Sequence, residues 1–430
     1  MSNDLNFPNG LHLLHAWQCG DKEAEQRLRA IYEEAVNGSY DALFATPPPS
    51  DRVHVCGPVD LLALTIMFRL YGITSEAFYK EDAERFIRCS LITQRLMGMP
   101  KQYISWPVYG FTAEAMGQTM IYSDQYSPGT DPDDALFNQE TWRQVTTPAL
   151  DSGIPKLIAE YCDSYHRLTK QPPVLHLSAP YSLAADVFGQ EAIVKALIDD
   201  ADFVAAFLDL LAERVLSPWI GQFFAAYPEG WVELSDASGS PLFIGPENCT
   251  NIAIAASQRL RQSHPLGTRI YDANYRGDYV TRAQENQSRR SRRRSPAKAT
   301  STTPSLQALF KAKDSVCPDY VIRLAEDRID ISFYEEMAIQ ENKPLFLGIG
   351  ATQVDRNSIA DFESQNEQTR EFSREYTLAV KRVAQTIAQN GYENRSSPWP
   401  GNLYFEDISA ESSFKLIETI FSNVFEHGAI

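Results

Sequence analysis

The chain has 430 residues, 43% of them hydrophobic, which is enough to bury a large core as one decorated domain or as two domains. Its formal net charge of −17 argues against general binding to a nucleic-acid backbone, because that binding depends on Lys and Arg. The six cysteines form no paired motif, the N-terminus lacks the pattern of a secretory signal, and no apolar stretch is long enough to span a membrane. We therefore expect a cytoplasmic protein without a nucleic-acid or membrane partner.

The first part of the chain is predicted to be helical. Apolar residues recur near helical spacing over residues 8–37, which predicts an amphipathic helix there. Two further helices are expected over residues 59–70 and 80–96. We expect residues 1–54 to form a helical extension that precedes the main domain, residues 55–430.

The rest of the chain alternates short apolar runs with helical patterns. The predicted strands cover residues 103–107, 120–122, 174–177, 231–234, 268–272, 320–324, 345–350 and 403–405. The predicted helices between and after them cover residues 191–227, 332–342, 367–390 and 412–427. Repeated strand–helix–strand order is typical of an α/β protein with a parallel sheet.

One segment interrupts this alternation. Residues 283–305 contain a dense run of arginines followed by a Thr/Ser/Pro stretch, with almost no apolar residues. Such a segment cannot form a packed core, so we expect a disordered insertion. A nuclear-localisation or nucleic-acid patch is the alternative, but the remainder of the chain is strongly acidic. A tolerated surface insertion is therefore favoured.

Two carboxylates follow predicted strands directly. Asp236 comes after residues 231–234 and is followed by small residues, which leave room for a ligand. Asp272 ends another strand, beside Asn274. Polar residues at the C-terminal ends of buried parallel strands are where barrel enzymes place their chemistry. Helix capping is the alternative role for Asp236, and the sequence does not decide between the two.

Other catalytic signatures are missing from the sequence. Gly348 and Gly350 lack the third glycine of the dinucleotide fingerprint, so they predict a tight turn after a strand. No phosphate-binding loop, no GxSxG nucleophile motif and no local zinc-ligand motif is present. His176 lies inside an apolar strand, which favours a hydrogen-bonded core histidine over a metal ligand.

The order of several short motifs resembles the uroporphyrinogen decarboxylase superfamily. Each motif is weak alone, but together they follow the family order over roughly residues 55–425. The matching segments are residues 72–85, residues 112–117 (like "eAealG"), residues 179–183 (like "APxTL") followed by Gly189, residues 198–204, residues 236–239 (like "D-S-x-A-G"), residues 344–350 and the closing helix.

This resemblance implies a (β/α)8 TIM-type barrel and two chemistries, decarboxylation and zinc-dependent methyl transfer to thiols or corrinoid proteins. The chain departs from the residues of both. Arg52 is a poor substitute for the arginine-rich motif of the decarboxylases. The position of the decarboxylases' catalytic Asp falls near Pro107 in this chain. The methyltransferase zinc ligands fall at residues 271–274 and 399–402, where no His or Cys stands. The resemblance therefore indicates a diverged member.

Three functions remain open at this point. The first is a decarboxylase-like lyase acting on a small carboxylated, partly aromatic metabolite, with Asp236 or Asp272 as acid or base. The second is zinc- or corrinoid-linked methyl transfer, and the third is a non-catalytic binding protein. We expect a small-molecule ligand, no metal or other cofactor, and a homodimer as the assembly to test. The predicted substrate-binding residues are Tyr109, Tyr181, Ser182, Ser238, Tyr271 and Asn274.

Overall fold

The structure is a computed structural model of the chain, and it describes most of its length. The described residues are 3–49, 51–100, 103–273, 304–317, 320–323, 329–391 and 402–430. Asn274 and all but the last two residues of the predicted insertion, 283–305, lie outside this part. Residues 304 and 305 begin a helix.

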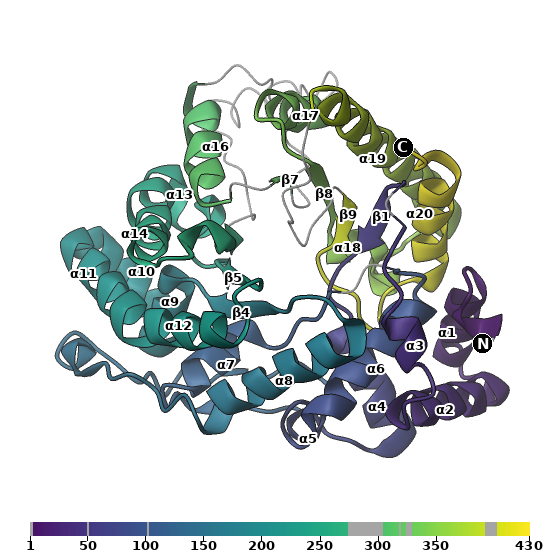
Figure 1. The fold of residues 1–430 in the computed structure, drawn as a ribbon, viewed down its shortest axis with the longest axis horizontal. Helices are drawn as coiled ribbons and strands as arrows, with labels where there is room; N and C mark the ends of the chain where they lie inside the picture. The colour runs from purple at the N-terminus through teal and green to yellow at the C-terminus, as the bar shows by residue number, and fades with distance from the viewer. Residues whose placement is uncertain are drawn as a thin grey trace.

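Within the described residues, the strands form two parallel sheets and one small hairpin (Figure 1). The four-stranded sheet has the order β1-β9-β8-β7, and the three-stranded sheet has the order β4-β5-β6. The antiparallel hairpin pairs β2 with β3. The bounds are β1 His54–Cys56, β2 Met120–Ile121, β3 Gly129–Thr130, β4 Val174–Ser178, β5 Trp231–Ser235, β6 Ile270–Ala273, β7 Val321–Arg323, β8 Leu345–Ile349 and β9 Asn402–Phe405.

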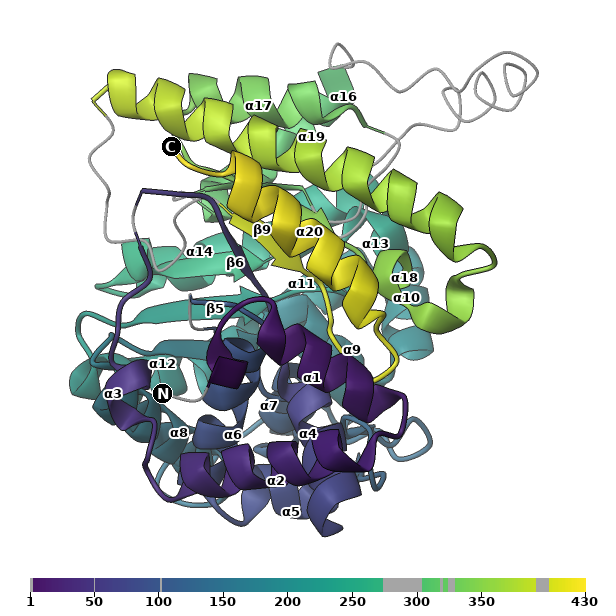
Figure 2. The same ribbon diagram turned by 90° about the vertical axis from the view of Figure 1, so that its right-hand side faces the viewer.

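Helices surround the two sheets on the outside (Figure 1). The helices are α1 Asn9–Gln18, α2 Lys22–Val36, α3 Asp41–Phe44, α4 Asp60–Tyr71, α5 Ser75–Lys80, α6 Ala83–Leu96, α7 Val108–Glu114, α8 Gly153–Thr169, α9 Pro180–Phe188, α10 Gln190–Asp199, α11 Ala201–Leu211, α12 Ser217–Ala226, α13 Pro241–Asn248, α14 Ala255–Ser263, α16 Pro304–Val316, α17 Ile331–Gln340, α18 Ala351–Val354, α19 Phe362–Gln389 and α20 Phe414–His427. Figure 2 shows α19 and α20 side by side, and they pack against β8, β9 and β1. No helix of the described residues is both long and apolar enough to cross a membrane.

Three predicted helices are shorter or more broken than expected. The helix predicted over residues 8–37 is two helices, because Asp21 caps α2 by accepting hydrogen bonds from the backbone amides of Glu23 and Ala24. The helix predicted over residues 80–96 begins only at α6, where Asp82 caps in the same way. The helical pattern over residues 191–227 breaks at Asp200, whose side chain caps α11. Polar caps inside an apolar pattern were the signal that periodicity alone missed.

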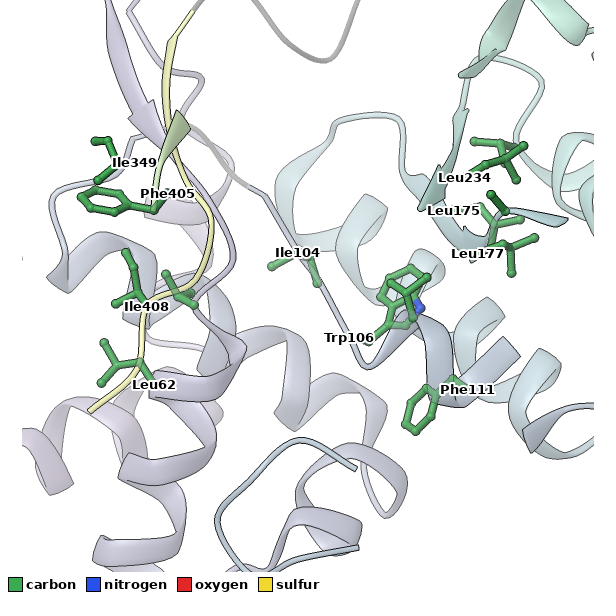
Figure 3. Packing of buried hydrophobic residues seen from close by; sticks show 14 of the residues in the cluster. Leu62, Ile104, Trp106, Phe111, Leu175, Leu177, Leu234, Ile349, Phe405 and Ile408 are labelled. Carbon is green, nitrogen blue, oxygen red and sulfur yellow. The ribbon is translucent and has the colours of Figure 1, made fainter. Parts of the chain in front are cut away.

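The strand predicted over residues 103–107 is also wrong as a strand. Its residues 103–107 are described, but they pair with neither sheet. Figure 3 shows Ile104 and Trp106 between Leu175, Leu177 and Leu234 of one sheet and Ile349 and Phe405 of the other. The segment thus runs between the sheets as extended chain. The other long predicted strands and helices are present within a few residues of their expected bounds.

Alternation along the strands separates two buried faces. Leu345, Leu347 and Ile349 of β8 belong to the large core under the helices, and we call this side the outer face. Phe346, between them, points to the inner face, where side chains of both sheets meet. The inner cluster contains Cys56, Tyr103, Trp231, Tyr271, Cys317, Tyr320 and Phe346. A residue's position in this alternation therefore decides whether it faces the helices or the space between the sheets.

Candidate functional site

A cavity of about 330 Å³ lies at the C-terminal ends of strands from both sheets. β5 and β6 contribute Ser235 and Ala273 to it, and the turn after β9 contributes Glu406. Residues that follow β1 and the segment 105–110 complete the wall. β4 and β5 are parallel and in register, and the amide of Ala179 donates to the carbonyl of Ser235 at 2.8 Å. The segments that follow these two parallel strands therefore lie at the same end of the sheet.

The cavity lining combines carboxyl groups with aromatic rings. Neither Lys nor Arg is among the described residues that line it. Serine, proline and other small residues make up most of the remaining wall. The five carboxyl groups belong to Asp60, Glu233, Asp236, Glu406 and Asp407, and the four aromatic rings to Tyr103, Trp106, Tyr109 and Tyr404. The charge of the lining is thus negative, which is the opposite of a site built to hold carboxylates.

Glu233 lies on the inner face of β5 and is buried. Its register partner on β4 is His176, whose Nδ1 lies 3.3 Å from Oε1 of Glu233. Tyr271 donates a hydrogen bond to Oε2 at 2.9 Å, and Tyr103 donates to Oε1 at 3.4 Å. Burial acts to raise the pKa of Glu233, but the charge of His176 and these hydroxyl groups outweigh it and hold the pKa below its usual value. Glu233 is therefore an ionised group at neutral pH.

Asp60 is the first residue of α4, just after β1. Its side chain is 7% exposed and lines the cavity. Tyr79 donates a hydrogen bond to Oδ2 at 2.9 Å. Burial raises the pKa of Asp60 to about 7; the Tyr79 hydroxyl opposes this rise and the charge of Asp407 adds to it. Asp60 can therefore exchange a proton near neutral pH.

Asp236 organises the loop that follows β5. Its Oδ1 accepts hydrogen bonds from Oγ of Ser182 at 2.8 Å and from the amide of Gly239 at 2.9 Å. Oγ of Ser182 accepts in turn from the amide of Ser238 at 3.1 Å. The hydroxyl of Tyr109 accepts from the amide of Ala237 at 3.1 Å. Asp236 and Tyr109, both predicted site residues, therefore shape the cavity wall and fix the loop.

Asp272 does not line the cavity. It lies between Tyr271, which faces inward, and Ala273, so its side chain is on the outer face of β6. It is 1% exposed, and neither carboxylate oxygen has a hydrogen-bond partner among the described residues. Burial, together with the charge of Asp236, holds the pKa of Asp272 well above its usual value. In the described structure, Asp272 therefore does not reach the cavity, as its predicted catalytic role would require.

The other predicted substrate-binding residues are spread around the cavity rather than in it. Tyr271 reaches Glu233 from the inner face, as described above. Tyr181 is buried, and its hydroxyl has no hydrogen-bond partner in the described part of the chain. Oγ of Ser238 donates to Gln190 at 2.9 Å. Ser182 and Ser238 thus belong to the hydrogen bonds of the Asp236 loop. Asn274 lies outside the described residues.

Sequence reasoning missed Asp60 and Glu233. Glu233 was visible as the one charged residue within the apolar run 231–234, which is costly to bury unless it has partners. Asp60 was hidden because β1 has only three residues and was not predicted, so nothing marked Asp60 as the end of a strand. Tyr103 and Tyr404, which line the cavity beside them, follow no recognisable motif.

The described residues do not assemble the zinc ligands that the family resemblance implies, and residues 274 and 399–401 lie outside them. Within the described residues, no three or more His, Cys, Asp or Glu side chains are grouped so that they could hold a metal ion. At the position of the first ligands, Tyr271 donates to Glu233 and Asp272 lies on the outer face. The described donor set therefore does not fit a zinc ion, and no reaction step is derived through one.

Comparison with solved structures finds a similar fold. A methyltransferase from Methanosarcina mazei matches with a TM-score of 0.51 and 13% sequence identity, covering 91% of this chain and 96% of the other. At this identity the likeness concerns the fold alone. The sequence matches no protein-family model and no curated protein. The chain is thus an α/β protein with parallel sheets whose fold resembles that of a methyltransferase.

Proposed function

We propose that this protein is a methyltransferase-like enzyme that binds one small-molecule reactant in the cavity at the strand ends. The observation that carries the proposal is the cavity itself, with a carboxyl group of pKa about 7 in its wall, at the C-terminal ends of the strands of a methyltransferase-like fold. The enzymes of such parallel α/β folds use this end of the sheet for chemistry.

The proposal also includes a specific fold, in which the two sheets are parts of one barrel. We infer one (β/α)8-type barrel of a diverged member of the uroporphyrinogen decarboxylase superfamily. The pairing of β1 with β9 supports it, because a barrel joins its first strand to its last. In the proposed barrel, the extended residues 103–107 between the sheets would take the position of the second strand.

Asp60 is the proposed proton-transferring residue. In methyl transfer to an N–H or S–H acceptor, a bond forms between the heteroatom and the methyl carbon. The bond from that carbon to the methyl donor breaks, and its electron pair leaves with the donor. The acceptor's proton then passes to the Asp60 carboxylate. A pKa near the working pH suits this exchange. Glu233, held ionised, supplies fixed negative charge nearby.

Decarboxylation of a carboxylated metabolite is less well supported. Arginines are the residues expected where carboxylates are held. Arg323, on β7, points to the outer face and donates to the hydroxyl of Tyr376 at 2.8 Å. The described lining offers a carboxylate substrate only like charges. The charge of the described wall therefore favours methyl transfer over the expected action on a carboxylated metabolite.

Methyl transfer can be tested directly with a labelled donor. Purified protein is incubated with ¹³C-methylcobalamin and a panel of small thiols and amines, and methylated products are followed by NMR. Asp60→Asn should lower the rate about 100-fold or more, because it removes the proton acceptor. Asp186→Asn is the matched control, since burial also raises the pKa of Asp186 to about 7 but its side chain is not in the cavity lining. Equal rates for both variants and the parent would contradict the role of Asp60, and no transfer to any acceptor would contradict the proposed reaction.

A further inference from the structure

The charge of the cavity wall points to the kind of ligand it accepts. Asp60 is more than nine-tenths buried and lines the cavity. Its Oδ2 accepts a hydrogen bond from the hydroxyl of Tyr79. Burial and the nearby charge of Asp407 both disfavour the ionised form of Asp60, so a ligand that donates to its carboxylate or carries positive charge would stabilise it.

Two tyrosine rings form a corner in the wall of the same cavity. The ring centroids of Tyr103 and Tyr404 are 5.8 Å apart, and their planes are nearly perpendicular, at 88°. Both rings line the cavity. The face of an aromatic ring attracts a cation, and the attraction grows when water is excluded. A corner of two rings next to carboxyl groups is therefore chemically suited to a compact cation with an apolar shell.

An anion would meet the opposite conditions. It would lose its water next to carboxyl groups, without a Lys or Arg among the described lining residues. Two described arginines have other partners: Arg323 donates to the hydroxyl of Tyr376, and Nε of Arg261 donates to the carbonyl of Ile270 at 2.6 Å. A neutral ligand would gain apolar contacts but would leave the Asp60 carboxylate without a favourable charge.

We propose that the cavity selects a small organic cation, an amine or methylated ammonium, whose charged nitrogen lies between Asp60 and the Tyr103–Tyr404 corner. The inference rests on the proposed function only in taking this cavity as the reactant site. It adds the substrate class, which neither the fold nor the resemblance provides. A methylated ammonium would be the methyl-carrying reactant, whereas a protonated amine would accept the methyl group only after passing a proton to the Asp60 carboxylate.

Three probes of nearly equal shape separate charge from size. Choline carries a trimethylammonium group, 3,3-dimethyl-1-butanol carries a neutral tert-butyl group in its place, and 3,3-dimethylbutanoate adds a negative charge. Isothermal titration calorimetry of the full chain at pH 8 should show choline binding about tenfold more tightly than the alcohol, or better. The carboxylate should bind most weakly. Asp60→Asn should remove the preference for choline, whereas Asp186→Asn should retain it.

Each other outcome overturns the inference in a distinct way. Equal binding of choline and the alcohol would show a cavity that does not select charge. Tightest binding of the carboxylate would show an anion site. If no probe binds, although the parent and the variant both unfold cooperatively, the cavity is excluded as a cation site. None of these results decides methyl transfer, which is measured separately with the labelled donor, so the two proposals can fail independently.

Discussion

Glu233 and Asp272 lie on neighbouring strands of one sheet, both buried, yet their surroundings are opposite. Glu233 faces inward and has His176, Tyr271 and Tyr103 around its carboxylate, which lower its pKa. Asp272 faces the helices, has no hydrogen-bond partner among the described residues, and has a raised pKa. Burial is similar in both cases, so the partners decide whether the charge survives.

This difference shows that the face of a strand matters as much as its end. Both residues belong to strands that approach the cavity, and only the inner one lines it. A shift of one residue along a strand exchanges the two faces. Asp272 ended a predicted strand and therefore looked catalytic, whereas Glu233 lay within one and was overlooked.

The largest expected effect is on Glu233. Glu233→Gln leaves the buried His176 without its carboxylate partner and should lower the free energy of unfolding by on the order of 3–5 kcal/mol. Chemical denaturation measures this loss. Glu160→Gln breaks an exposed pair with Lys156 and should cost less than about 1 kcal/mol. Equal losses for the two variants would remove the contrast between the buried pair and the surface pair.

Asp60 should impose a pH-dependent cost on folding. Its folded pKa of about 7 lies above its ordinary value of 3.8, so the folded state binds the proton more tightly. The cost is absent below pH 4, grows as the pH rises towards 7, and is constant above that. Asp60→Asn should therefore stabilise the protein by on the order of 2–4 kcal/mol at pH 8 and by little at pH 4. Denaturation at both pH values checks this, and a pH-independent difference would contradict it.

Asp272→Asn tests the carboxyl group on the outer face of β6. A buried carboxyl group without donors is costly, so the amide should stabilise the protein by about 1–3 kcal/mol at pH 8. Methyl transfer and choline binding should be unchanged, because the side chain is not in the described cavity lining. Loss of either activity with retained stability would show that the outer face takes part in function.

The smallest expected effect concerns the loop held by Asp236. A Cβ atom at Gly239 would lie 2.3 Å from Oδ2 of Asp236. Gly239→Ala should therefore cost about 1–2 kcal/mol by overpacking. Gly221→Ala is the control, because its Cβ would meet no atom within 4 Å. A thermal melt of the two variants measures the difference, and equal melting temperatures would show that the loop adjusts freely.

The sequence predicted the alternation of strands and helices and the strand ends. It did not predict on which face of a strand each side chain lies. Residues 174–177 and 231–234 are mainly apolar runs, which indicate buried strands. Such runs do not show which side chains face the helices and which face the space between the sheets. β1 was missed because three residues carry too little pattern, and with it Asp60 was missed. The extended segment 103–107 has the composition of a strand but finds no pairing partner in the described structure. Tertiary contacts, which no local pattern encodes, decide these features.

The protonation state of Asp60 is the most direct measure of a working carboxyl group in the cavity. Aspartate labelled with ¹³C at the carboxyl carbon gives a resonance for each Asp, and the Asp60→Asn variant identifies the one that belongs to Asp60. Titration by NMR should give a midpoint near pH 7 for the unliganded protein. Saturating choline should move that midpoint to lower pH, because a bound cation favours the carboxylate. A midpoint near pH 4 that choline does not shift would contradict both the poised proton and the cation site.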